Sequence, residues 1–346
     1  MEEQLNSNFI PLKRPSLKRD DFLSVLNAMI DKKIYPGEIY NNLENLVKDK
    51  FKLSNLIFLP SKWIAIKLFF QIEIIKKNFK KIYVSNNCDP FYYYILNEEN
   101  VEIVPLDINP DNFLPLDENI EKENALLIIN FPYGYPVDFE NILKLNIPIF
   151  ADLSGSFGVI NGGKFIGNYF DYVIFSFKDE DLITCGDGAL FIISDQKKYS
   201  NYIKIVEEFN LKLSDYNCAL LYSQIEKLEK IRSSMKKLFL FFKSFINSDY
   251  IKIVFDKDYN ESNIPNYSNF IIFKEENCDY IKEFAEKYKI EIVNLIKKPI
   301  SFFLNDKKFY KNSMKIASNY FKIPFYPTLD EKSVEKISIF LKKISE

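Results

Sequence analysis

The chain has 346 residues, enough for two compact domains, and its 47% hydrophobic and 27% charged residues predict a soluble globular protein with a large core. Its 46 basic and 48 acidic residues nearly cancel, so we expect neither nucleic acid nor an anionic membrane as a partner. The sequence contains no histidine, which excludes Ser-His and Cys-His nucleophiles, imidazole bases and histidine metal sites.

The cysteines and the N-terminus bear on the cellular compartment of the protein. Cys88, Cys185, Cys218 and Cys278 lie far apart and form no CxxC pair, which argues against a thiolate zinc site and a disulfide scaffold. The acidic start Met-Glu-Glu-Gln precedes no apolar signal region, and we find no apolar run long enough to span a bilayer. These features predict a cytoplasmic protein without a metal.

The first two thirds of the chain predict alternating helices and strands. Helices are expected at residues 20–32 and 38–50, separated by Tyr35-Pro36-Gly37. Six strands follow at 55–59, 81–85, 101–104, 125–130, 147–152 and 171–177, with helices at 62–77, 89–97 and 138–144. Strands such as 125–130 are apolar on both faces, which is typical of a sheet covered by helices on each side. The pattern predicts an α/β fold with a mostly parallel, doubly wound sheet.

The remainder predicts a second, smaller unit. The turn Gly186-Asp187-Gly188 indicates a hairpin into a strand at 189–194, and a long helical stretch is expected at 214–245. Strands at 251–255, 269–273 and 290–293 then combine with helices at 279–287 and 331–343, and 256–266 reads as a surface loop. We therefore divide the chain into a large domain, 1–245, and a small α+β domain, 246–346.

Polar residues at the carboxyl ends of the predicted parallel strands are the candidate site, because ligands bind there in open α/β sheets. Asp152 ends one strand, Ser176 ends another with the turn 178–181 beyond it, and Ser61 with Lys62 opens the helix after the first strand. A hydroxyl and an ammonium at a helix N-terminus can seat a phosphate. Each residue also has an ordinary interpretation: Ser61 as a helix cap, 178–181 as a solvated loop, and Asp152 as a cap of the next turn.

Several segments, in order along most of the chain, resemble the DegT/DnrJ/StrS sugar aminotransferases. The central ones are residues 150–158 (FADLSGSFG), 162–167 (GGKFIG), 175–177 (FSF) and 184–188 (TCGDG). They correspond to the family's E-D-A-A-Q-A-x-G, G-K-x-x-G and F-S-F-H-x-x-K-x-x-T-x-G-E-G-G. Shorter similarities lie at 11–16, 131–138, 213–230 and 323–330.

This resemblance implies a fold-type I pyridoxal-phosphate (PLP) transferase, homodimeric, that aminates keto groups on nucleotide-linked sugars. Asp152 falls where the family's aspartate pairs with the pyridine nitrogen. Ser176 and Ser61 fall at positions that bind the cofactor phosphate, and Asn210 matches an asparagine that the neighbouring subunit adds to that phosphate. The implied pathway is nucleotide-sugar or surface-glycan biosynthesis.

The sequence also departs from the family pattern. The position of the Schiff-base lysine is Asp181, and the histidine before it is Lys178. The S-G-T phosphate loop becomes Ser61-Lys62-Trp63, the Gln of A-A-Q-A becomes Gly155, and the Arg of N-Y-R becomes Lys212. A carboxylate cannot form a Schiff base, so we expect no standard PLP transamination at Asp181.

Three interpretations of these departures stay open. PLP chemistry survives with a displaced lysine, Lys178 or Lys62. Or the protein uses noncovalent pyridoxamine phosphate (PMP), as the family's sugar dehydratases do, with Asp181 or Lys178 as the base. Or the site is degenerate, and the protein binds sugar nucleotides or serves as partner subunit of an active paralogue. The loss of the Lys, the S-G-T loop, the Gln and the Arg together favours the third interpretation.

Overall fold

The computed structural model describes residues 9–346 except 33, 78, 100, 117–119, 180, 247–249, 276–277 and 305–307. The start of the chain, which was considered above for a signal, lies outside the described residues. Among those that are described, no helix is both long and apolar enough to cross a membrane.

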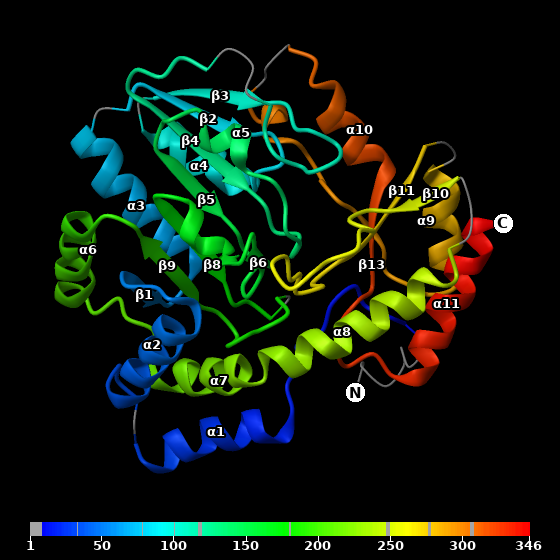
Figure 1. Ribbon diagram of the computed structural model, residues 1–346, viewed down its shortest axis with the longest axis horizontal. Helices are drawn as coiled ribbons and strands as arrows, with labels where there is room; N and C mark the ends of the chain where they lie inside the picture. Colours follow the sequence, from blue (N-terminus) through cyan, green and yellow to red (C-terminus); the bar gives the residue numbers. More distant parts are fainter. Residues whose placement is uncertain are drawn as a thin grey trace.

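A seven-stranded sheet forms the centre of the protein (Figure 1). Its strand order is β1-β9-β8-β5-β4-β2-β3, and β9 alone runs antiparallel to both of its neighbours, β1 and β8. The strands are β1 (Leu56–Leu59), β2 (Lys81–Ser85), β3 (Glu102–Leu106), β4 (Ala125–Asn130), β5 (Ile149–Asp152), β8 (Tyr172–Ser176) and β9 (Ala189–Ile193). The predicted α/β fold with a mostly parallel sheet is confirmed.

Helices cover both faces of this sheet, as strands that are apolar on both faces require. Within β4, Leu127 and Ile129 face one hydrophobic cluster, whereas Leu126 and Ile128 face the other. The first cluster includes α2 (Glu38–Phe51), α7 (Asp215–Glu226) and α8 (Leu228–Lys243). The second includes α3 (Lys62–Lys77), α4 (Pro90–Glu98) and α6 (Gln196–Glu208). Helix α1 (Arg19–Ile30) packs outside α7.

Four antiparallel strands form a second sheet, in the order β10-β11-β13-β12. They are β10 (Ile251–Ile253), β11 (Phe270–Lys274), β12 (Val293–Asn294) and β13 (Tyr320–Ile323). Helices α9 (Cys278–Lys287), α10 (Lys311–Asn319) and α11 (Glu331–Ser345) accompany this sheet at one end of the molecule (Figure 1). This region has the predicted α+β character, and a domain boundary at 245/246 stays a prediction.

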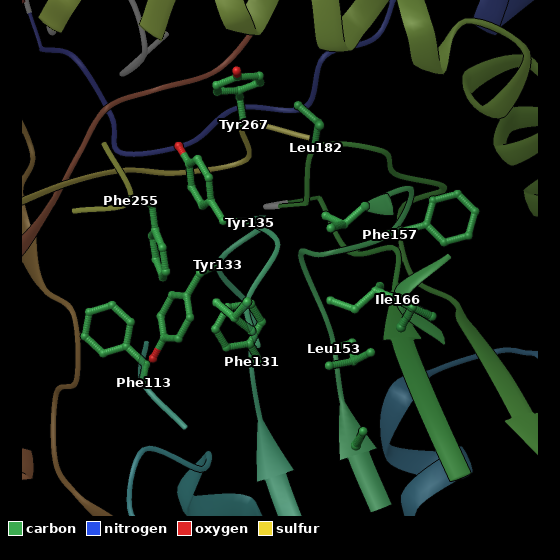
Figure 2. Close-up of a cluster of buried hydrophobic side chains, with 14 of the residues drawn as sticks. Phe113, Phe131, Tyr133, Tyr135, Leu153, Phe157, Ile166, Leu182, Phe255 and Tyr267 are labelled. Carbon is green, nitrogen blue, oxygen red and sulfur yellow. The ribbon is translucent and has the colours of Figure 1, made fainter. Parts of the chain in front are cut away.

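Aromatic side chains join the two sheets. Phe255, just after β10, stacks on Tyr135 with ring centres 4.7 Å apart and also lies 5.9 Å from Tyr133. Figure 2 shows these rings side by side beyond the strand ends of the large sheet. Since Phe255, Tyr133 and Tyr135 belong to one buried cluster, the two sheets share a continuous core.

Several element predictions need correction. The predicted helix 214–245 is interrupted at Lys227, where α7 ends and α8 begins, and the predicted helix 138–144 is a single turn, α5 (Glu140–Leu143). The predicted strand at 290–293 is displaced to β12, Val293–Asn294. Helices α6 and α10 and strand β13 went unpredicted, as did the small hairpin of β6 (Ile160–Asn161) with β7 (Lys164–Phe165). The hairpin predicted from Gly186-Asp187-Gly188 is confirmed, because β8 and β9 pair in antiparallel register around it.

Candidate functional site

The candidate site lies at the carboxyl edge of the large sheet, where neighbouring parallel strands β5 and β8 end. Asp152 is the last residue of β5 and pairs in register with Ile174 of β8, so Ser176 ends β8 two residues further on. Lys62, the first residue of α3, follows β1 at the same edge. The topology therefore brings together Asp152, Ser176, Lys62 and the turn beyond Ser176, as the sequence predicts.

The Asp152 carboxylate is fully buried and accepts four hydrogen bonds. Its Oδ2 atom accepts one from the Lys62 ammonium at 2.9 Å and one from the Tyr92 hydroxyl at 3.0 Å. Its Oδ1 atom accepts one from the Ser154 hydroxyl at 2.6 Å and one from the Ser154 backbone N–H at 3.1 Å. A carboxylate offers about four lone-pair positions, so this acceptor is saturated by the chain itself.

Lys62 and Asp152 form a buried ion pair in which both groups are charged. Burial alone would raise the pKa of Asp152, but the Lys62 ammonium and the Ser154 donors outweigh it and hold that pKa below its ordinary value. Burial would likewise lower the pKa of Lys62, yet the Asp152 carboxylate, with smaller contributions from Asp89 and Asp181, raises it. Neither partner is therefore free to titrate near neutral pH.

Asp181 turns back onto the end of β8. Its Oδ2 atom accepts a hydrogen bond from the Ser176 hydroxyl at 2.7 Å and another from the Lys178 backbone N–H at 2.8 Å. The carboxylate thus takes up the hydroxyl that the family resemblance assigns to a cofactor phosphate. Glu180 of the same turn lies outside the described residues.

Trp63 fills the space beside the two lysines. Its ring packs against that of Phe91, with centres 3.9 Å apart and planes tilted by 41°. The ammonium groups of Lys62 and Lys178 lie 4.8 and 4.5 Å from the indole centre. Both distances are within the range of cation–π attraction, so the indole helps to hold both candidate displaced lysines.

Two further predicted residues lie apart from this cluster. The Ser61 hydroxyl accepts a hydrogen bond from the Ile64 backbone N–H at 3.3 Å, which confirms its interpretation as a helix cap. Asn210 is exposed, follows α6 and adopts a left-handed backbone with φ 51°. A phosphate-binding role of Ser61, or of Asn210 in a neighbouring subunit, stays a prediction.

The backbone at Gly155, where the family has a glutamine, has no room for a side chain. Gly155 has φ +82°, and a Cβ atom there would lie 2.7 Å from the Pro132 carbonyl oxygen. A side chain at this position requires the loop to move. The Arg-to-Lys departure places Lys212 in an ion pair with Glu207 at 3.0 Å.

Residues 94–342 match the profile of the DegT/DnrJ/EryC1/StrS aminotransferase family. The chain belongs to this family. Among curated relatives, it is 26% identical over 145 residues to GDP-perosamine synthase of Escherichia coli O157:H7. It is 27% identical over 206 residues to UDP-4-amino-4,6-dideoxy-N-acetyl-beta-L-altrosamine transaminase of Campylobacter jejuni strain NCTC 11168. These matches cover 37% and 53% of this chain and 40% and 52% of the relatives, so they span about half of each protein.

Solved structures agree with the fold over nearly the whole chain. Helicobacter pylori PseC, an aminotransferase involved in the biosynthesis of pseudoaminic acid, matches with a TM-score of 0.84 at 16% identity. The match covers 97% of this chain and 99% of that one. Similar solved chains include PLP and PMP forms, which makes these the cofactors that the family implies.

The residues at this edge do not fit that cofactor. PLP requires an aspartate at the ring nitrogen, donors for its phosphate and a lysine for its aldehyde. Here the aspartate is already saturated with Lys62, Tyr92 and Ser154, and the Ser176 hydroxyl donates to Asp181. The position that the resemblance gives to the lysine holds Asp181 itself. Among the described residues there is also no group of three or more acidic or cysteine side chains that could hold a metal.

The sequence indicated Asp152, Ser176, Lys62 and Asp181 but missed Tyr92, a partner of Asp152. Tyr92 comes from α4, and its hydroxyl reaches the site only because α4 packs beside α3 on one face of the sheet. The interpretation of Asp152 as a cap of the next turn is confirmed, because its side chain accepts from the Ser154 backbone N–H two residues on. Lys62 was considered as a phosphate or aldehyde ligand, not as the partner of Asp152.

Proposed function

We propose that this protein acts in nucleotide-sugar and surface-glycan biosynthesis as a family member that does not carry out PLP transamination. The observation that carries the proposal is Asp181, a carboxylate bonded to Ser176 at the position where the family resemblance requires an amine. No Schiff base can form there, and the two nearby lysines, Lys62 and Lys178, both make other contacts. Lys62 is committed to Asp152, and the Lys178 ammonium lies against Trp63.

The substrate class we propose is a nucleotide-linked sugar. The names of the matched relatives mention GDP- and UDP-linked sugars. Because the family fold is retained over nearly the whole chain, a sugar-nucleotide surface can persist without the cofactor chemistry. We further propose that the protein is cytoplasmic, as its sequence predicts, and that it binds this ligand alone or as the partner subunit of an active paralogue.

The PMP alternative has less support. A base must be able to turn towards the proton that it removes and lie within hydrogen-bond reach of it. The Asp181 Oδ2 atom already accepts from Ser176 and from the Lys178 backbone N–H, which favours a structural role for this carboxylate.

We also propose that the protein is a homodimer and that the second copy covers the outer face of α1. Phe22, Leu26 and Ile30 lie one helical turn apart on that face and are 59%, 49% and 67% exposed. A contiguous exposed apolar strip of this kind is typical of a protein interface.

The experiment is a pair of assays on the full chain. We expect calorimetric titration with GDP- and UDP-linked sugars to detect binding of at least one of them without PLP. We expect no amino transfer from glutamate to keto sugar nucleotides with PLP present. Sustained amino transfer above the protein-free rate contradicts the proposal, as does the absence of any sugar-nucleotide binding in both the free protein and a complex with a paralogue.

A further inference from the structure

We propose that Lys62 and Asp181 are built-in replacements for the two charged ends of the cofactor, so that the site is completed by the chain's own charges. The ammonium of Lys62 stands in for the protonated ring nitrogen, and the carboxylate of Asp181 stands in for the phosphate. This inference rests on the proposed function and adds which residue excludes PLP: Lys62, more than the missing lysine.

Asp152 is saturated by donors of the chain, and Lys62 is the cation among them. A buried aspartate that is fixed as an anion needs a cationic N–H donor, and the Lys62 ammonium supplies one at 2.9 Å. Tyr92 and Ser154 fill the other acceptor positions. A ring nitrogen could reach Asp152 only by displacing Lys62, which would then be left as a buried cation without this partner.

Two donors surround the carboxylate of Asp181. A hydroxyl, from Ser176, and a backbone N–H, from Lys178, converge on one carboxylate oxygen. This is the donor chemistry that binds phosphate oxygens at the ends of parallel strands. Asp181 already provides an anion at this place, so a phosphate group would meet both an occupied donor set and a like charge.

The space beside these two ends holds an aromatic ring of the protein itself. The Trp63 indole, packed at a tilt against Phe91, lies against the ammonium groups of both Lys62 and Lys178. The chain thus supplies a cation, an anion and a flat ring at one edge of the sheet, which are the three chemical parts of the cofactor.

The test restores the family residues in steps. In a background with Asp181→Lys and Trp63→Thr, a lysine is available but Lys62 still holds Asp152. Adding Lys62→Gly frees Asp152, whereas adding Lys178→Gly is the matched control, because Lys178 is the nearby lysine whose ammonium has no bond to Asp152. Each purified variant is titrated with PLP, reduced with borohydride and analysed by intact mass and peptide mapping.

We expect a reducible adduct at position 181 with Lys62→Gly added and at least tenfold less adduct in the background and with Lys178→Gly. Equal adduct in all three variants, or adduct in none of them, overturns the inference. Amino transfer by the unaltered protein contradicts the proposed function instead, so the two failures are distinguishable.

A second measurement needs no substitution that could unfold the protein. Brief acetylation of the unaltered chain, read by peptide mass spectrometry, should modify Lys62 at least tenfold more slowly than Lys144, whose ion pair with Glu140 is exposed. Similar rates at the two lysines overturn the inference, because Lys62 would then not be held at Asp152.

Discussion

Lys62 connects the two charged parts of the site, since its ammonium pairs with Asp152 and its pKa responds to Asp181. Removing one partner of a buried ion pair leaves an unpaired buried charge and costs about 3–5 kcal/mol, whereas an exposed pair contributes less than about 1 kcal/mol. We therefore expect Lys62→Met to lower the free energy of unfolding by about 3–5 kcal/mol in urea. The control is Lys144→Met, which breaks an exposed pair with Glu140. A loss at Lys62 no larger than at Lys144 would contradict the ion pair.

The same pair predicts a pH dependence. The folded-state pKa of Asp152 is lowered, so its ionisation stabilises the fold above the unfolded value of about 3.9 and is lost as the pH falls through the folded value. We expect the stability difference between the unaltered protein and Asp152→Asn to be greatest near neutral pH and to shrink below about pH 4. Chemical unfolding over this range measures it, with Glu140→Gln as the exposed control. A difference that grows towards acid pH would refute the assignment.

A comparison of Gly155 with Gly163 distinguishes the cost of backbone strain from the cost of a steric clash. Both have positive φ, at +82° and +78°, but a Cβ at Gly155 meets the Pro132 carbonyl oxygen at 2.7 Å, whereas a Cβ at Gly163 meets nothing within 4 Å. We expect Gly155→Ala to destabilise the protein by about 1–3 kcal/mol more than Gly163→Ala, the usual cost of forcing atoms into a packed region. Equal unfolding free energies in the two variants would show that the loop yields easily.

Among the elements, α1 buries one charged side chain, Asp21, and exposes an apolar strip. Asp21 is buried and accepts hydrogen bonds from the Ser223 hydroxyl at 2.7 Å and the Lys227 ammonium at 3.0 Å, which fixes α1 on α7. The opposite face carries the apolar strip of Phe22, Leu26 and Ile30. A second chain that covers the strip would explain why these apolar side chains point outwards.

We expect Leu26→Lys to shift the protein towards monomer in sedimentation at micromolar concentration, because it places a charge in the proposed interface. Its unfolding free energy within one chain should change by less than about 0.5 kcal/mol, since Leu26 is half exposed. Phe309→Lys alters an equally apolar exposed side chain outside α1 and serves as the control. If both variants sediment as the unaltered protein does, α1 is not the interface.

The elements that could be predicted are those with strong local signals. The breaker Tyr35-Pro36-Gly37 marked the ends of α1 and α2 to within two residues, and doubly apolar strands such as β4 were found with their bounds. Helix α6 was not predicted because only two of its side chains, Tyr202 and Val206, are buried. Two apolar positions are too few for a periodic hydrophobic pattern. Strand β13 was not predicted because it follows α10 directly and is stabilised by long-range pairing with β11.

On the scale of the whole molecule, the topology rather than any one motif assembles the site. Ends of parallel strands meet at one edge, so Asp152 and Ser176 could be placed together from the sequence. The identity of the partner that saturates Asp152 could not, because Lys62 is 90 residues away in the chain and its direction depends on how α3 packs on the sheet. The edge of the sheet that carries the site could therefore be predicted from the sequence. The pairing of Lys62 with Asp152 at that edge could be seen only in the three-dimensional structure.

An absorbance titration of the unaltered full chain with PLP, followed by borohydride reduction and intact mass, shows whether the site excludes the cofactor. We expect no aldimine band and no mass increase beyond that of a surface-lysine control protein, since Lys62 is held by Asp152 and position 181 carries a carboxylate. A stoichiometric adduct mapped to Lys62 or Lys178 would contradict the account and show that a displaced lysine binds the cofactor.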